Sequence, residues 1–224
     1  MVDGSNLERF EPMSITTKAQ AEAICGSLSA PSKMPCHGYS TPARRCQVGQ
    51  KMRNVKGSVC SVCYALKGRY VFNNVQNAME FRFQSLTHPL WVDAVSFLIE
   101  RTEDPFFRWH DSGDLQGVWH LKKIAKVARK LPHVSFWLPT REYKIVSDYV
   151  SAGNTIPENL TIRLSALMID GPAPESIAQR LGVTVSGVAK ESTFTCPSSV
   201  QGNVCGDCRA CWDKSTFSVS YKKH

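Results

Sequence analysis

The sequence lacks long apolar runs. None of its apolar stretches approaches the length needed to span a bilayer, and the N-terminus has neither the basic start nor the apolar core of a signal peptide. It also lacks low-complexity tracts, and with 42% hydrophobic and 21% charged residues its composition excludes a disordered or fibrous protein. We therefore expect one soluble, cytoplasmic domain covering residues 1–224, with no membrane partner.

Acidic residues are fewer than basic ones. The 19 Asp and Glu against 27 Lys and Arg give a formal net charge of +8 and a pI near 9.1, and a basic protein attracts polyanions such as nucleic acid. The basic residues are spread along the chain, with one denser stretch at Arg44, Arg45, Lys51, Arg53 and Lys56. Because most such charges only solvate a surface, charge alone leaves a nucleic-acid partner as a hypothesis.

Cysteine is abundant, with nine residues in the chain. In a reducing compartment a dense set of thiols is typical of metal binding or redox chemistry, and disulfides are rare there. The odd number of cysteines also argues against complete pairing. The sequence therefore predicts that most of these cysteines are metal ligands.

The hydrophobic pattern divides the chain into three segments. Residues 1–70 predict a loop-rich, cysteine-containing segment, residues 71–191 alternate strands with amphipathic helices, and residues 192–224 hold a cysteine-rich loop and a last strand. Strands are expected at 13–17, 106–110, 134–138, 160–165, 183–188 and 217–221, and helices at 18–28, 71–86, 90–101, 118–130, 145–152 and 175–181.

Polar side chains follow the strands of this βα pattern. Strands that alternate with helices predict a parallel sheet, and their C-terminal ends share the face where active sites of βα folds lie. The residues at these ends are His110, Asp111, Asp114, Thr140, Arg141, Glu142, Arg163, Ser165, Lys190 and Glu191. We therefore expect an α/β fold, a partial (βα) barrel with parallel strands, in preference to an open doubly wound sheet, with these side chains around one mouth.

The C-terminal cysteines have the spacing of a cluster site. Cys205, Cys208 and Cys211 are spaced Cys-x2-Cys-x2-Cys, and Cys196 is followed by Pro197. Three close cysteines plus a remote Cys-Pro are the elements of a ferredoxin run, although here the remote cysteine comes first. Zinc more often uses paired Cys-x2-Cys knuckles, so this segment favours a [4Fe-4S] cluster, with zinc as the alternative.

A second set of cysteines lies in the N-terminal segment. Cys60 and Cys63 form a compact Cys-x2-Cys, and Cys36 and Cys46 precede them. A thioredoxin-like pair would lie in a βαβ unit, whereas these loop-rich surroundings fit a metal ligand better. Cys25, within an expected helix, fits the core instead. Two clusters, or one cluster bound from both ends of the chain, are both open at this stage.

Three motifs together resemble one phage family. The segments 60–70 (CSVCYALKGRY), 108–115 (RWHDSGDL) and 196–212, which ends CGDCRACW, are similar to the phage "gene product 88" family, and the similarity extends from about Ser32 to the C-terminus. This resemblance implies a phage or prophage origin, and so the cytoplasm of a host cell. The family name carries no activity with it.

The chain also has a more distant resemblance to radical S-adenosylmethionine enzymes. These hold a [4Fe-4S] cluster on a partial βα barrel by a Cys-x3-Cys-x2-Cys loop, and a Gly-Gly-Glu-like motif follows the next strand. Cys60 and Cys63 match the last two cysteines of that loop, and the segment 112–115 matches the place of the motif. The first cysteine would fall at Lys56, so Cys46 or Cys36 would have to supply the third thiolate.

The resemblance implies roles for particular residues. Ser112, Gly113 and Asp114 would form the cofactor-binding motif, with Asp114 at the amino group of adenosylmethionine and Arg141 or Arg163 at its carboxylate. The C-terminal cysteines would then hold an auxiliary cluster.

Two functions follow as hypotheses. The first is a phage [4Fe-4S] protein on a radical-enzyme-like scaffold, either catalytic with a small-molecule substrate or passing electrons to a partner. The second is an accessory protein without catalysis, braced by zinc or a cluster, that binds nucleic acid or a host protein. In that second case Arg44, Arg45, Arg53 and Lys56 would neutralise phosphates. The stacking surfaces would come from Trp109, Trp119, Trp137 and Trp212.

Overall fold

The computed structural model describes residues 14–188 and 194–222, which include all nine cysteines. The strand-end residues Lys190 and Glu191 lie outside the described residues. The strands are β1 (Gly38–Tyr39), β2 (Phe106–Trp109), β3 (Ser135–Thr140), β4 (Leu160–Ser165), β5 (Thr184–Val188), β6 (Phe194–Thr195) and β7 (Ser218–Tyr221). The α-helices are α1 (Lys18–Cys25), α2 (Gln47–Met52), α3 (Asn73–Ser85), α4 (Trp91–Glu100), α5 (Val118–Lys130), α6 (Tyr143–Ser151) and α7 (Glu175–Leu181).

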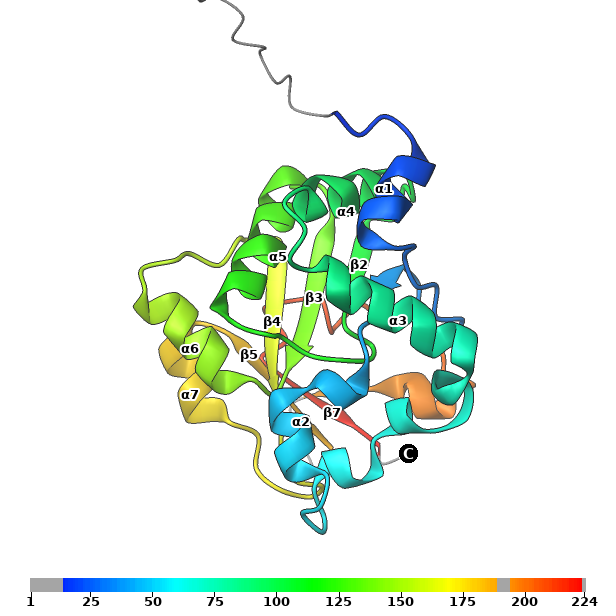
Figure 1. The fold of residues 1–224 in the computed structure, drawn as a ribbon. Coiled ribbons are helices and arrows are strands. Elements are labelled where there is room, and N and C mark those ends of the chain that lie inside the picture. The colour runs from blue at the N-terminus through cyan, green and yellow to red at the C-terminus, as the bar shows by residue number, and fades with distance from the viewer. Residues whose placement is uncertain (1–13, 189–193, 223–224) are drawn as a thin grey trace, which may run out of the picture.

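The seven strands form one parallel sheet in the order β1-β2-β3-β4-β5-β7-β6. From β1 to β5 the order follows the chain in one direction, without the reversal at the centre that a doubly wound sheet would have, and only at the end does β7 return to lie between β5 and β6. Right-handed crossovers that always step the same way place every crossover helix on one face of the sheet. This arrangement confirms the predicted α/β fold with the strand order of a partial βα barrel (Figure 1).

The two faces of the sheet differ in polarity. Side chains alternate along a strand, so Phe107 and Trp109 pack with α4 and α5 in the main apolar core, while Arg108 between them faces the other side. On that other side Thr161 and Arg163 of β4 are buried beneath the C-terminal segment. In Figure 1 this segment (orange to red) runs on the side of the sheet away from α5. This second face, called the inner face below, therefore carries buried polar side chains beside a small apolar cluster, and the cysteine-rich loop covers it.

Several predicted boundaries change in the structure. α1 ends at Cys25 instead of residue 28 because Gly26 takes a left-handed φ of 76°. Thr17 caps α1 through a reciprocal capping box with Gln20, so the described residues 14–17 form no strand, and the strand predicted at 13–17 is wrong there. The two-residue strands β1 and β6 escaped prediction because so short a segment shows no alternation.

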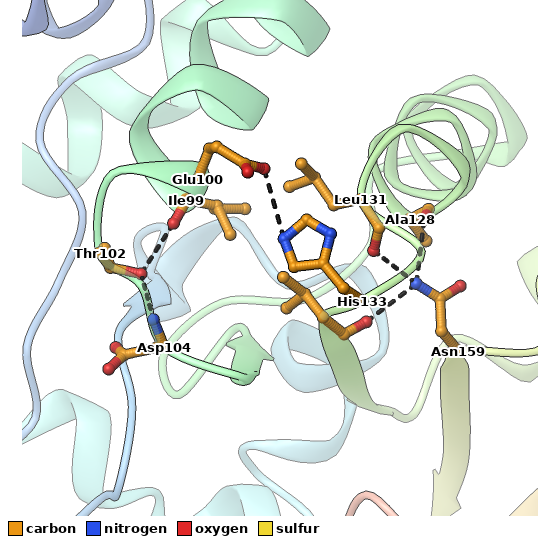
Figure 2. Close-up of polar contacts among 9 residues, drawn as sticks. Ile99, Glu100, Thr102, Asp104, Ala128, Leu131, His133 and Asn159 are labelled. Atoms are coloured by element: carbon orange, nitrogen blue, oxygen red, sulfur yellow. Dashed lines mark hydrogen bonds and ion pairs between the residues drawn. The ribbon is translucent and has the colours of Figure 1, made fainter.

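Asn159 joins the end of α5 to the start of the sheet. Its side-chain amide donates hydrogen bonds of 2.9 Å to the backbone carbonyls of Ala128, Leu131 and Val134 (Figure 2). Carbonyls at the end of a helix lack their regular helical partners, and this side chain adds a donor to each of these three, of which Ala128 and Leu131 also accept the N–H groups of Leu131 and Val134. Asn159 thereby fixes the turn between α5 and β3, immediately before β4.

We expect Asn159→Asp to be less stable than Asn159→Ala. The alanine variant removes the side-chain donor of three carbonyls, of which those of Ala128 and Leu131 keep a backbone N–H, and should lower the free energy of unfolding by about 2 kcal/mol. The aspartate has the same shape but turns a carboxylate oxygen toward the carbonyls, which adds repulsion. Urea denaturation of the two variants checks this order, and an aspartate variant as stable as the wild type would contradict it.

Candidate cysteine sites at the sheet

Asp114 connects the ends of β2 and β3. One carboxylate oxygen accepts hydrogen bonds from the Thr140 hydroxyl at 2.6 Å and the Leu115 N–H at 2.8 Å, and the other accepts from the Arg141 N–H at 2.9 Å. Burial raises the pKa of Asp114, and these hydrogen bonds act against that rise. Both oxygens of the residue predicted to contact adenosylmethionine thus bind groups of the protein itself.

Ser112 and Gly113 tie the same loop to the chain after β1. The Ser112 hydroxyl donates to the Thr41 carbonyl at 2.9 Å, and the Thr41 N–H donates to the Ser112 carbonyl at 2.9 Å. Gly113 has a φ of 89°, and a Cβ there would lie 1.9 Å from the Thr41 hydroxyl oxygen. Glycine is required here by both conformation and space. The predicted cofactor motif therefore packs together the ends of three strands.

Arg141 and Glu142 lie on the same edge. The Arg141 Nε donates to the Ala166 carbonyl at 3.1 Å, and the Glu142 carboxylate accepts the Val48 N–H of α2 at 2.8 Å. Glu142 is buried, and burial raises its pKa. This hydrogen bond holds the short helix α2 near the C-terminal ends of the strands (Figure 1).

Three N-terminal cysteines gather at this edge. The sulfur atoms of Cys46 and Cys60 both lie within 4.0 Å of one point, the position that a Cβ atom at Gly49 would occupy. Burial raises the pKa of the Cys46 thiol, and neighbouring Asp114, Cys63 and Cys60 raise it further. Burial also raises the pKa of Cys60, whereas nearby Arg141 lowers it. The structure therefore brings Cys46, Cys60 and Cys63 together beside the predicted strand-end residues.

Cys36 belongs to the other group of cysteines. It packs in a second apolar cluster with Cys211, Trp137 and Trp212 on the inner face of the sheet. Burial raises the pKa of the Cys36 thiol to about 12, with further effects from charged neighbours that include Asp104, Arg108 and Cys205. The sequence grouped Cys36 with the N-terminal cysteines. In space it lies with the C-terminal cysteines instead, because it lies just before β1, and β1 pairs with β2 next to the C-terminal segment.

The four C-terminal cysteines converge with Cys36. The Cys205 N–H donates to the Lys33 carbonyl at 3.2 Å, and the Cys205 sulfur lies 3.9 Å from the Met34 sulfur. Burial raises the pKa of Cys205, and neighbouring Cys196 and Cys208 raise it further. The Cys211 sulfur lies 3.2 Å from the Tyr221 hydroxyl. Burial raises the pKa of the Cys211 thiol to about 11. Burial thus favours the protonated form of Cys36, Cys205 and Cys211, so a metal that binds them must displace their protons.

Arg163 anchors the C-terminal cysteine loop. Its side chain is fully buried, and its guanidinium donates five hydrogen bonds to backbone carbonyls at 2.6 to 3.4 Å. The acceptors are Val185, Ala210, Cys211, Asp213 and Phe217. A guanidinium has five N–H groups, so none is left for a substrate carboxylate. The structure shows Arg163 bonded to the backbone, and its predicted contact with a substrate carboxylate stays a prediction. Nothing in the sequence pointed to these bonds, because the acceptor residues lie far from Arg163 along the chain.

Two buried histidines meet at the same edge, and the sequence pointed to only one of them. His110 has a left-handed φ of 57°, and its ring lies 5.2 Å from the ring of His120 in an edge-to-face arrangement. Neither ring nitrogen of His110 has a hydrogen-bond partner among the described residues. Both side chains are at most 3% exposed. The sequence placed His110 at a strand end but gave no sign that His120, on α5, would meet it.

None of the nine cysteines forms a disulfide. Among residues 14–188 and 194–222, no three His, Cys, Asp or Glu side chains are arranged so that they could hold a metal ion. In the same residues, no helix is long and apolar enough to cross a membrane. The thiols other than Cys25 lie in two groups, and in the described residues neither group has the arrangement of a site for one metal ion.

A comparison with family models places the chain. The model described as "Gene product 88" matches residues 9–214, which is most of the 224 residues. No curated protein and no solved structure matches, so the resemblance to radical S-adenosylmethionine enzymes stays a hypothesis. The extent of the family match confirms the likeness seen in the three motifs, and the chain belongs to the gene product 88 family.

Proposed function

We propose that this protein binds a [4Fe-4S] cluster through Cys196, Cys205, Cys208 and Cys211, and that the cluster serves electron transfer or structure. The observation that supports the proposal is that Cys196 and Cys211 pack in one cluster on the inner face, with Cys196 and Cys208 as neighbours of Cys205 in a loop held by Arg163. Four thiolates on one cluster leave no iron free for a substrate, which favours electron transfer or bracing over catalysis at this site.

The chemistry of the donors fits iron and sulfide. Every candidate ligand is a thiol, and soft thiolates suit both iron–sulfur clusters and zinc. A zinc ion holds its sulfurs about 2.3 Å away and most often uses paired Cys-x2-Cys knuckles, which the Cys-x2-Cys-x2-Cys spacing of 205–211 does not provide. Positive charge from Arg108 and Arg209 also lies near Cys205 and lowers its pKa, which favours the thiolate.

Cys46, Cys60 and Cys63 form a second candidate site in this proposal. Only three cysteines gather there, beside Asp114 and Arg141. A cluster at this site would keep one iron without a protein thiolate. The proposal includes no adenosylmethionine, because both Asp114 oxygens are already bonded within the protein.

Iron and sulfide analysis of anaerobically purified protein tests the proposal. We expect a brown protein with iron and acid-labile sulfide in equal amounts and a visible absorption that bleaches with dithionite. A colourless protein with stoichiometric zinc would contradict iron–sulfur binding at both sites.

Matched cysteine variants separate the two sites. Cys208→Ala should remove the iron of the C-terminal site, and Cys60→Ala should remove that of the N-terminal site, each lowering total iron to about half if both sites are filled. Cys25→Ala is the control, because this thiol is fully buried in the main core and donates to the Ala21 carbonyl. Equal iron in Cys208→Ala and Cys25→Ala would overturn the C-terminal assignment.

A further inference from the structure

One long stretch of the chain contains no acidic residue. Between Glu22 and Glu80 the sequence has no Asp or Glu. The basic residues in this stretch are Lys33, Arg44, Arg45, Lys51, Arg53, Lys56, Lys67 and Arg69. A stretch with eight basic and no acidic residues creates a local positive potential. The net charge of +8 does not by itself show in which part of the chain that potential lies.

Most of these cations lie exposed over one end of the sheet. Arg44, Lys51, Lys56, Lys67 and Arg69 are exposed, on and around α2 and the 3-10 turns that follow it. The backbone is fastened there by hydrogen bonds between the strand-end loop 167–169 and residues 57–59. In the described part of the chain none of these five forms an ion pair with a carboxylate. Their charge is therefore available to a ligand.

Exposed aromatic and aliphatic side chains lie among the cations. Tyr64 is 47% exposed and Phe72 is 57% exposed, and they flank Lys67 and Arg69 in the chain. Of the large apolar side chains that are exposed in the described residues, six of nine fall between Val55 and Phe81. Aromatic faces next to unpaired cations are the two elements that single-stranded nucleic acid requires, for stacking and for phosphates.

The tryptophans expected to stack are placed elsewhere. Trp109, Trp137 and Trp212 are at most 6% exposed and pack in the two apolar clusters. Trp119 is 42% exposed but lies on α5. Stacking by Trp109, Trp137 and Trp212 is therefore excluded in this structure, and Tyr64 and Phe72 are the exposed rings beside the cations.

We propose that single-stranded nucleic acid binds the basic–aromatic surface formed by Arg44, Lys51, Lys56, Tyr64, Lys67, Arg69 and Phe72. The cations contact phosphates, and the two rings stack on bases. An acidic protein would use the cations but not the exposed rings, and a duplex hides its base faces from them. The surface lies beside the Cys46, Cys60 and Cys63 group but does not depend on any metal there.

Fluorescence anisotropy of a labelled oligothymidylate, titrated with the full-length protein as purified, tests this inference. We expect binding whose affinity falls steeply with salt, because each neutralised phosphate contributes about 0.7 to the slope of log K against log salt for a single strand. A labelled duplex of equal length should bind more weakly. Absence of binding, equal affinity for the duplex, or stronger binding of polyglutamate than of oligothymidylate would each overturn the proposal.

Paired variants locate the surface. Lys51→Ala with Lys56→Ala should reduce the salt slope by about 1.4, whereas Lys122→Ala with Lys126→Ala on the exposed side of α5 removes equal charge and should leave the slope nearly unchanged. Equal effects of the two pairs would show a response to net charge alone and would contradict a local surface.

A second pair of variants tests whether the exposed rings stack on bases. Phe72→Ala should weaken binding by at least about 5-fold, the low end of the effect of losing one stacked base. Trp119→Ala removes an exposed ring outside the surface and should leave affinity unchanged. Thermal unfolding of each variant checks that it is folded, and a folded Phe72→Ala protein with wild-type affinity would exclude stacking at this ring.

Discussion

Arg163→Met is expected to lower the free energy of unfolding by at least about 3 kcal/mol, because it removes five hydrogen bonds to backbone carbonyls, of which those of Ala210 and Phe217 also accept a backbone N–H. Methionine fills much of the same space, so the loss reports the hydrogen bonds more than a cavity. Three of the five carbonyls belong to residues 210–213. The C-terminal cysteine loop should therefore loosen, and iron at that site should fall with stability.

Urea denaturation together with iron analysis checks this expectation. Arg163→Lys keeps the positive charge but has three donors on one nitrogen and cannot reach five carbonyls, so it should be intermediate. Arg180→Met is the control, because this arginine is exposed on α7. If Arg163→Met and Arg180→Met were equally stable, the anchoring role of Arg163 would be wrong.

Acidification below about pH 6.5 is expected to destabilise the fold through His110 and His120. Burial lowers the pKa of His110 to about 3, with a further effect of Arg108, and burial lowers that of His120 well below its usual value, helped by His110 and Lys123. Both rings are therefore neutral in the folded state. In the unfolded chain each has a pKa of about 6.5 and binds a proton as the pH falls.

This difference in proton uptake decides whether stability rises or falls with pH. Below about pH 6.5 the unfolded state binds more protons, so stability falls with pH until the folded pKa is reached, about 3 for His110. From about pH 7 to about pH 4.5 His110 should contribute a loss of about 2.5 kcal/mol, and His120 should add a loss of the same sign. Urea midpoints measured across this range give the slope directly.

A pair of asparagine variants isolates the histidine contribution. His110→Asn removes a titrating ring, and asparagine tolerates the left-handed conformation at this position. Its stability should depend less steeply on pH than that of the wild type, whatever its absolute value. His133→Asn is the control, because His133 is exposed and meets only Glu100 on the surface (Figure 2). Parallel pH curves for His110→Asn and the wild type would refute the assignment.

Local pattern accounts for most of the fold. The helix predicted at 118–130 is α5 with the same bounds, because its apolar residues recur every three or four positions and that signal needs only one turn of neighbours. The alternation of strands with helices likewise predicted the parallel sheet, and the steady strand order confirmed the partial barrel. Short elements such as β1 were missed. The two residues of β1 form a strand only because they pair with β2, and their own sequence shows no strand pattern.

The cysteine chemistry was visible in the sequence, but its spatial grouping was not. Thiol type and close spacing predicted metal ligands at 60–63 and 205–211 from the residues alone, and this stays a prediction to be tested by iron analysis. Only the tertiary structure separated Cys36 from Cys46, placing one on the inner face and the other at the edge of the sheet. It also decided that the donors of Arg163 hold backbone carbonyls of residues far along the chain. Periodicity and spacing are local properties of a sequence, whereas the partner of a buried donor depends on which distant segments the sheet brings together.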